Sequence, residues 1–175
     1  MRAANLLPTA CLMAGSVLIL AAGPAQTPLK YKEWKLVTPK PLQMDPVLAA
    51  MCARQPALQG SNGHAARFYR VYVNKRGDNA MGHRIAYPAG SAIVKEKLVP
   101  DGADYKVELL TVMVKHEKGY SPESADWEFY VANPKGERTA APKELSNCIS
   151  CHKDRAATDM VFGTYARVGK SSPKP

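Results

Sequence analysis

Cysteine is scarce in this sequence, and its scarcity excludes one class of protein. The chain has four cysteines in 175 residues, and Cys11 lies within an N-terminal apolar segment. The other three are an odd number, which argues against a framework of disulfide bonds. Cys148 and Cys151 form a close pair, whereas Cys52 stands alone in an apolar stretch that we interpret as a helix with a buried core thiol.

Long apolar runs are also missing beyond the N-terminus, so we expect no membrane span in the mature chain. Residues 1–25 carry a single charge, Arg2, then an apolar run shorter than the roughly 20 residues that cross a bilayer. Small residues at Gly23 and Ala25 follow this run. The order predicts a secretory signal peptide cleaved after Ala25, and hence a periplasmic protein.

Basic residues outnumber acidic ones and give a formal net charge of +9. They are scattered, and they form neither a basic helix nor a platform of alternating aromatic and basic residues. The sequence therefore argues against a nucleic-acid partner. An acidic redox partner protein is the expected use of this charge.

The length suits one main domain between two less regular ends. We expect an N-terminal extension with a short helix at residues 26–65, a main domain at 66–168 and a disordered tail at 169–175. The extension begins as an extended leader over 26–45, and Asp45 followed by Pro46 is typical of a helix start.

The main domain shows a strand-rich pattern followed by a helical one. Alternating or β-branched segments separated by turn residues predict sequential antiparallel strands over 68–73, 91–98, 105–115 and 126–131. Helices are predicted over 142–152 and 159–168. The fold class is therefore α+β, mostly antiparallel sheet with a few helices, and the cysteine pair lies on a helix near the C-terminus.

The most specific motif is Cys148-Ile149-Ser150-Cys151-His152. Two thiols one helical turn apart can add across the two vinyl groups of haem, and the next histidine can then bind the iron. A thioredoxin-like pair would need a βαβ unit, which the pattern lacks. A zinc site would need two further nearby ligands. We therefore predict one covalent haem c on Cys148 and Cys151, with His152 as the proximal iron ligand.

The ligand on the other side of the iron is less evident. The sequence offers six methionine and histidine candidates: Met81, Met113, Met160, His64, His83 and His116. Met113 lies within an apolar strand, so we expect its side chain in the core. His83 and His116 fall near strand ends, where we expect their side chains to be exposed to solvent. Met160 follows His152 too closely to reach the opposite side. This pattern favours an open distal site built from strands.

Three segments together resemble one family. They are residues 89–96, which include Val94-Lys95-Glu96, residues 127–130, and the haem motif with the downstream segment 158–162. Over roughly residues 66–168 they resemble the cytochrome P460 family, whose fold cytochrome c′-beta shares. The resemblance implies a mostly antiparallel β fold, a homodimer, and a haem whose distal pocket binds small nitrogen species such as hydroxylamine or nitric oxide.

The resemblance also assigns two strand positions. In hydroxylamine-oxidising members a lysine is joined covalently to the haem edge, and Lys95 stands at that position. The residues alone favour an exposed strand lysine, and only the resemblance gives the cross-link equal weight. The carboxylate that accepts substrate protons in active members is replaced here by Thr111, which cannot act as a base near neutral pH. Strand parity places Glu108 on the other face. Hydroxylamine oxidation is therefore in question.

Three functions stay open from the sequence. The first is a redox protein whose open haem binds small nitrogen species and can also oxidise them. The second is a plain electron-transfer cytochrome with a closed sixth position. The third is a haem-based gas-binding protein without turnover.

Overall fold

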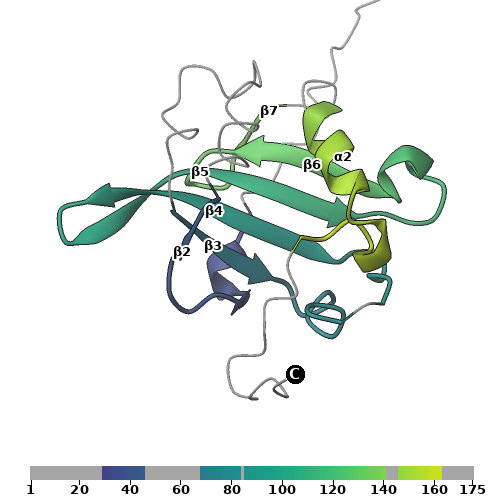
Figure 1. Ribbon diagram of the computed structural model, residues 1–175, viewed down its shortest axis with the longest axis horizontal. Helices are drawn as coiled ribbons and strands as arrows, with labels where there is room; N and C mark the ends of the chain where they lie inside the picture. Colours follow the sequence, from purple (N-terminus) through teal and green to yellow (C-terminus); the bar gives the residue numbers. More distant parts are fainter. Residues whose placement is uncertain (1–28, 46–67, 84, 141–145, 163–175) are drawn as a thin grey trace, which may run out of the picture.

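The computed structural model describes residues 29–45, 68–83, 85–140 and 146–162. The expected signal peptide, the helix after Asp45, Cys52, His64 and the tail lie outside these ranges. In the described part, seven antiparallel strands form one sheet in the order β1-β3-β4-β5-β6-β7, with β2 also paired to β3 (Figure 1). The strands are β1 (Lys35–Leu36), β2 (Leu42–Gln43), β3 (Phe68–Val73), β4 (Ala92–Asp101), β5 (Asp104–Lys115), β6 (Trp127–Ala132) and β7 (Arg138–Ala140).

The four expected strands are confirmed as the centre of this sheet. Strands β4 and β5 form a long hairpin whose turn contains Gly102, with a positive φ of 60° that suits glycine. The pairing shifts register between Lys97 and Leu98, which is the mark of a β-bulge. Short connections between consecutive strands favour antiparallel neighbours, as the sequence predicted.

The segment after residue 28 is more structured than an extended leader. It begins with the 3-10 turn η1 (Tyr31–Glu33) and then contributes both β1 and β2 to the outer edge of β3. Between these strands the Val37 amide donates to the Val71 carbonyl at 2.8 Å, and the Thr38 hydroxyl accepts from the Val71 amide at 2.9 Å. The segment therefore covers an edge that would otherwise expose unpaired backbone groups.

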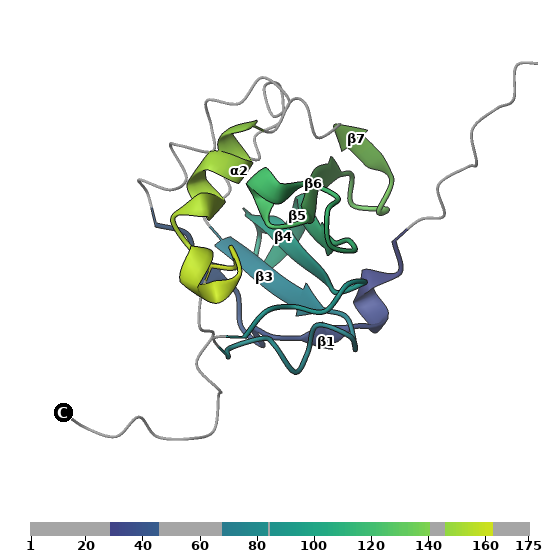
Figure 2. The same cartoon turned by 90° about the vertical axis from the view of Figure 1, so that its right-hand side faces the viewer.

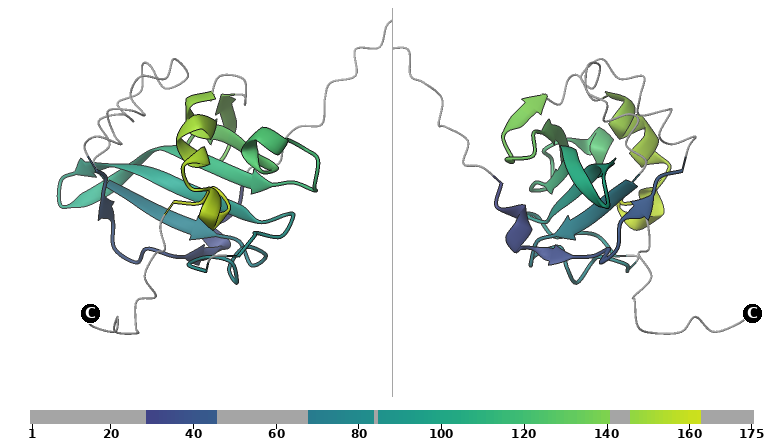
Figure 3. Two further views of the ribbon diagram at one scale, coloured as in Figure 1. Left: turned by 45° about the vertical axis from the view of Figure 1, so that its right-hand side comes forward. Right: turned by 90° about the vertical axis from the view of Figure 1, so that its left-hand side faces the viewer.

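Side-chain alternation divides the core into two layers. One face of the sheet, here called the helix face, carries Val71, Ile93, Met113, Phe129 and Val131. The opposite face carries Tyr72, Val94, Leu110, Val112 and Tyr130. Figure 2 shows the sheet between the C-terminal helix on one side and η1 on the other, and Figure 3 shows the same arrangement from two further directions.

The helix face is covered by α2 (Ser146–Lys153) and the 3-10 turn η6 (Ala156–Thr158). Helix α2 confirms the helix expected to carry the cysteines, and with the sheet it confirms the α+β class. The helix expected over 159–168 is wrong in its described part. Asp159 and Met160 have positive φ values of 52° and 63°, which a right-handed helix cannot contain. No helix among the described residues has the length and apolar character to cross a membrane.

Candidate functional site

Helix α2 presents the two cysteines and the histidine of the motif at the helix face of the sheet. Cys148 and Cys151 are half-buried and form no disulfide bond. Cys148 and Ile149 pack against the helix-face core. Three residues along an α-helix is close to one turn, so the two thiols lie on the same side of α2. His152 follows directly and is also half-buried.

The orientation of the His152 ring is fixed by the backbone of the next turn. Its Nδ1–H donates to the Met160 carbonyl at 2.6 Å. Burial lowers the pKa of His152 to about 4, the hydrogen bond to Met160 opposes that shift, and the positive charge of Lys95 lowers the pKa further. His152 is therefore neutral at physiological pH, and a proton on Nδ1 leaves the Nε2 lone pair available for a metal.

Two aromatic rings hold the imidazole from the side. Phe129 on β6 meets the His152 ring edge-on at 4.9 Å between centroids, and Phe162 does so at 4.8 Å. The Arg155 guanidinium lies over the Phe162 ring at 4.8 Å. Apolar rings around a neutral imidazole exclude water from one side of it, which is how a proximal iron ligand is commonly surrounded.

Lys95 and Thr111 are brought together on the sheet. They are direct partners across β4 and β5, in a row that continues to Val71 on β3 and Val131 on β6. Since Val71 and Val131 belong to the helix-face core, the row faces α2. The Lys95 Nζ lies 4.2 Å from the centroid of the Tyr69 ring. Lys95 is thus half-buried beneath the haem motif rather than on a solvent-facing strand surface.

The parity argument is confirmed for Leu109 and Met113. Leu109 and Met113 belong to the helix-face core, as expected for residues that alternate with Thr111. Leu110 belongs to the opposite face, the side to which parity assigned Glu108. The row of Lys95 and Thr111 therefore contains no carboxylate.

Most of the alternative iron ligands have other roles. Met113 is 8 % exposed within the helix-face core, as the sequence predicted. Met160 is buried in the same core and approaches His152 through its carbonyl. His83 is exposed, whereas His116, expected to be solvated, contacts Glu128 at 2.9 Å and stacks on Tyr120.

Sequence reasoning missed an ion pair next to the Met160 carbonyl. Asp159 forms a largely buried ion pair with Lys115, 44 residues earlier in the chain. The sequence assigns a role to neither residue, although Asp159 lies in the segment 158–162 that resembles the family. The signal available in the sequence was an acidic residue directly before the apolar residues Met160 and Val161.

The residues present suit an iron porphyrin. A half-buried, neutral imidazole with a fixed tautomer and two thiols on one helix turn is a donor set for a haem attached to a protein. The family model Cytochrome P460 matches residues 28–163. The chain therefore belongs to the Cytochrome P460 family, and it is a haem cytochrome. A search of curated proteins finds no match.

Proposed function

We propose that the haem of this protein is of the c type, joined covalently through Cys148 and Cys151 and ligated by His152. The observation that carries the proposal is the hydrogen bond from His152 Nδ1 to the Met160 carbonyl, on the same helix as the two half-buried thiols. When bound, the haem would supply an iron that exchanges electrons and binds small molecules. Thioether bonds to α2 would tie that iron to the helix face.

The chain's own residues would set the proximal side. The Met160 carbonyl holds the proton on His152 Nδ1, so that Nε2 stays an electron-pair donor. Phe129 and Phe162 restrict rotation of the ring. A low pKa for the free imidazole means that no proton competes for Nε2 above about pH 5, given the value of about 4.

We propose that Lys95 is the residue joined to the haem edge. Its place on the helix face supports this, because the positive charge lies close enough to His152 to affect the pKa of that ring. The contact with Tyr69 keeps the Lys95 side chain along the sheet. Loss of charge through a covalent bond would remove the desolvation penalty of a half-buried ammonium.

We further propose that the open iron position binds a small nitrogen species, such as nitric oxide or hydroxylamine, with at most slow oxidation. Thr111, the cross-strand partner of Lys95, has a hydroxyl that can donate or accept a hydrogen bond but cannot take up a proton near pH 7. The residues in this row therefore suit ligand binding better than proton-coupled oxidation.

The sequence suggests where this protein acts and what it contacts. We propose export to the periplasm, where covalent haem attachment takes place, and a homodimer that passes electrons to an acidic redox partner protein. The apolar run and small-residue exit of the N-terminal segment support export, and the net charge of +9 supports an acidic redox partner.

Absorption spectroscopy of purified protein tests the proposal. The ferric form is expected to be high-spin and to shift on addition of cyanide or nitric oxide, because an open position exchanges ligands. A low-spin spectrum that neither ligand changes would instead identify an electron-transfer cytochrome with a closed sixth position.

A further inference from the structure

The backbone beneath His152 has an unusual conformation. Asp159 and Met160 are consecutive non-glycine residues in the left-handed region, with φ values of 52° and 63°. Such residues persist where surrounding contacts over-determine them, and they concentrate at functional sites. Their conformation turns the chain out of η6 so that the Met160 carbonyl meets His152 Nδ1 at 2.6 Å.

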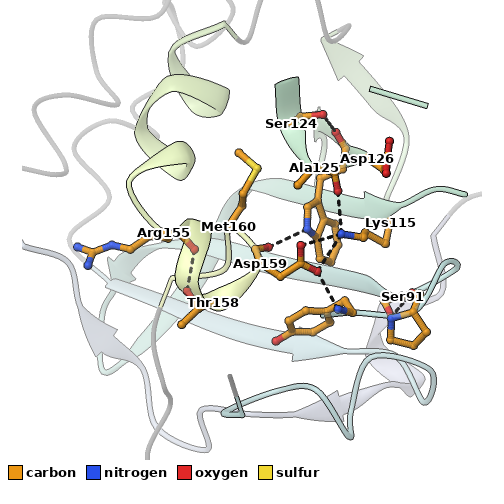
Figure 4. Close-up of polar contacts among 12 residues, drawn as sticks. Ser91, Lys115, Ser124, Ala125, Asp126, Arg155, Thr158, Asp159 and Met160 are labelled. Atoms are coloured by element: carbon orange, nitrogen blue, oxygen red, sulfur yellow. Dashed lines mark hydrogen bonds and ion pairs between the residues drawn. The ribbon is translucent and has the colours of Figure 1, made fainter. Parts of the chain in front are cut away.

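Three separate elements hold Asp159. The Lys115 ammonium, at the end of β5, lies 2.8 Å from both carboxylate oxygens of Asp159, and each of these side chains is only 11 % exposed. The Tyr87 amide donates to the same carboxylate at 2.7 Å, and the indole Nε1–H of Trp127 donates to the Asp159 carbonyl at 2.9 Å. Figure 4 shows these contacts converging on Asp159, with Lys115 also donating to the Ala125 carbonyl at 2.7 Å.

The next residue is fixed as firmly as Asp159. The Met160 amide donates to the Arg155 carbonyl at 2.9 Å, and its side chain is buried in the helix-face core. With the amide, the side chain and the preceding residue all held, the Met160 carbonyl has little freedom to move away from His152.

We propose that Asp159 and Lys115 are positioning residues for the iron ligand: their ion pair fixes the Met160 carbonyl, and through it the orientation and electron-donating strength of His152. This inference rests on the proposed function, since it assumes that His152 binds the haem iron. A hydrogen bond from the ring N–H to a fixed carbonyl makes the imidazole more basic, and a more basic ligand stabilises the ferric state. The ion pair of Asp159 and Lys115 would therefore keep the reduction potential of the haem iron low.

The position of the ion pair favours this role over a purely stabilising one, because Asp159 directly precedes the residue whose carbonyl contacts His152. Buried ion pairs are weak evidence for stability, because desolvation of the two charges offsets their attraction. What the pair adds here is a fixed position for an otherwise strained turn, one residue from the group that touches His152.

The test compares haem-loaded Lys115→Met and Asp159→Asn with the wild type. Asparagine tolerates the left-handed conformation and can still accept from the Tyr87 amide, so Asp159→Asn removes the ion pair with the least disturbance. Lys35→Met is the matched control, because the Lys35–Asp78 pair is also a lysine–aspartate contact but is 61 % and 34 % exposed and lies on β1. The readouts are the reduction potential and the iron–histidine stretching frequency of the ferrous protein.

We expect both variants to shift the reduction potential upward and the stretching frequency downward, with Lys35→Met unchanged and Lys115→Arg closer to the wild type than Lys115→Met. Wild-type values of both quantities in Asp159→Asn and Lys115→Met, even with a lowered melting temperature, would overturn the inference and leave a purely structural brace.

Failure of the proposed function would be visible earlier and separately, as wild-type protein that holds no covalent haem. In that case the ¹⁵N chemical shifts of the His152 ring in the full-length chain show whether the ion pair of Asp159 and Lys115 fixes the tautomer of His152. A proton fixed on Nδ1 in the wild type and mixed tautomers in Asp159→Asn would support the positioning role of the ion pair. The same tautomer mixture in both proteins would refute it.

Discussion

At the scale of single residues, Lys95 and Thr111 carry the chemistry that distinguishes the proposed functions. They face each other across β4 and β5, on the face that α2 covers. One is a nucleophile once deprotonated, and the other is a neutral hydroxyl. The pair therefore suits covalent attachment at one position and hydrogen bonding at the other, without a base for proton removal.

Replacing Lys95 by alanine tests the first of these roles. Peptide mapping of the wild type should show a haem-modified peptide that contains Lys95, separate from the peptide of Cys148 and Cys151. Lys95→Ala should lose that product and shift the absorption spectrum. Lys97→Met, on the same face, should keep the haem-modified peptide and the wild-type spectrum. If an amine-reactive label modifies Lys95 fully in the folded wild type, the cross-link is absent.

Introducing a carboxylate at Thr111 tests the second role. We expect weak or no hydroxylamine turnover in the wild type and a gain in Thr111→Glu, because a positioned base contributes on the order of 10²–10⁴-fold in rate. Thr111→Val, which matches the size of threonine but has no acid, should stay at the wild-type level. Fast turnover by the wild type would mean that another group serves as the base.

The motif residues can be located from the sequence, whereas the contacts that surround them cannot. His152 and its cysteines are adjacent in the chain, so their relation is local. Lys115 and Asp159 are 44 residues apart and meet only when β5 and the turn after η6 are packed together. The role of the Met160 carbonyl is a backbone property, which the identity of the side chain does not reveal.

At the scale of elements, the sheet follows local patterns in its centre and tertiary pairing at its edges. Strands β3 to β6 have the alternation and β-branched composition that predict strands. Strands β1 and β2 have two residues each and β7 has three, too few for a periodic signal. They form because their backbones pair with the open edges of β3 and β6. This pairing depends on the tertiary fold and not on the local sequence.

The turn before β7 provides a test of how firmly the N-terminal segment is docked. Gly136 has a φ of 87°, and a Cβ there would lie 2.8 Å from the Leu29 amide nitrogen. Gly102 has a similar φ of 60° with nothing within 4 Å. Gly102→Ala should lower the free energy of unfolding by about 1–2 kcal/mol from backbone strain alone. Gly136→Ala should lose about 1–3 kcal/mol more, because Leu29 must move.

Urea unfolding of the two alanine variants measures this difference directly. Equal losses in the two would show that the segment around Leu29 is free to move away from Gly136. A larger loss for Gly136→Ala would show that the segment before β1 is an integral part of the folded domain.

At the scale of the whole molecule, an ionic cluster joins β6 and β7 to His116, the residue that follows β5. Glu128 accepts from Arg138 at 2.5 Å and contacts His116 at 2.9 Å. Burial alone would raise the pKa of Glu128, but the hydrogen bonds from Arg138 and His116 outweigh burial and hold that pKa below its usual range. A carboxylate whose pKa is depressed by folding stabilises the native state only while it is ionised.

Stability should therefore fall in acid through Glu128. Its contribution is fully present above the unfolded pKa of about 4.3 and is lost as the pH falls through the lower folded value. Glu128→Gln should destabilise the protein at pH 7 and weaken the loss of stability between roughly pH 5 and pH 3. Glu117→Gln, at an exposed position nearby, is the control. Identical pH profiles for wild type and Glu128→Gln, followed by thermal unfolding, would contradict this assignment.

The whole account depends on haem being joined to α2 through Cys148 and Cys151. Intact-mass spectrometry of the purified protein under denaturing conditions tests that claim most directly. The account predicts the mass of residues 26–175 plus one haem, and the bare polypeptide mass for the Cys148→Ala, Cys151→Ala double variant. A wild type that shows only the unmodified mass, with haem released by acid–acetone, would contradict it.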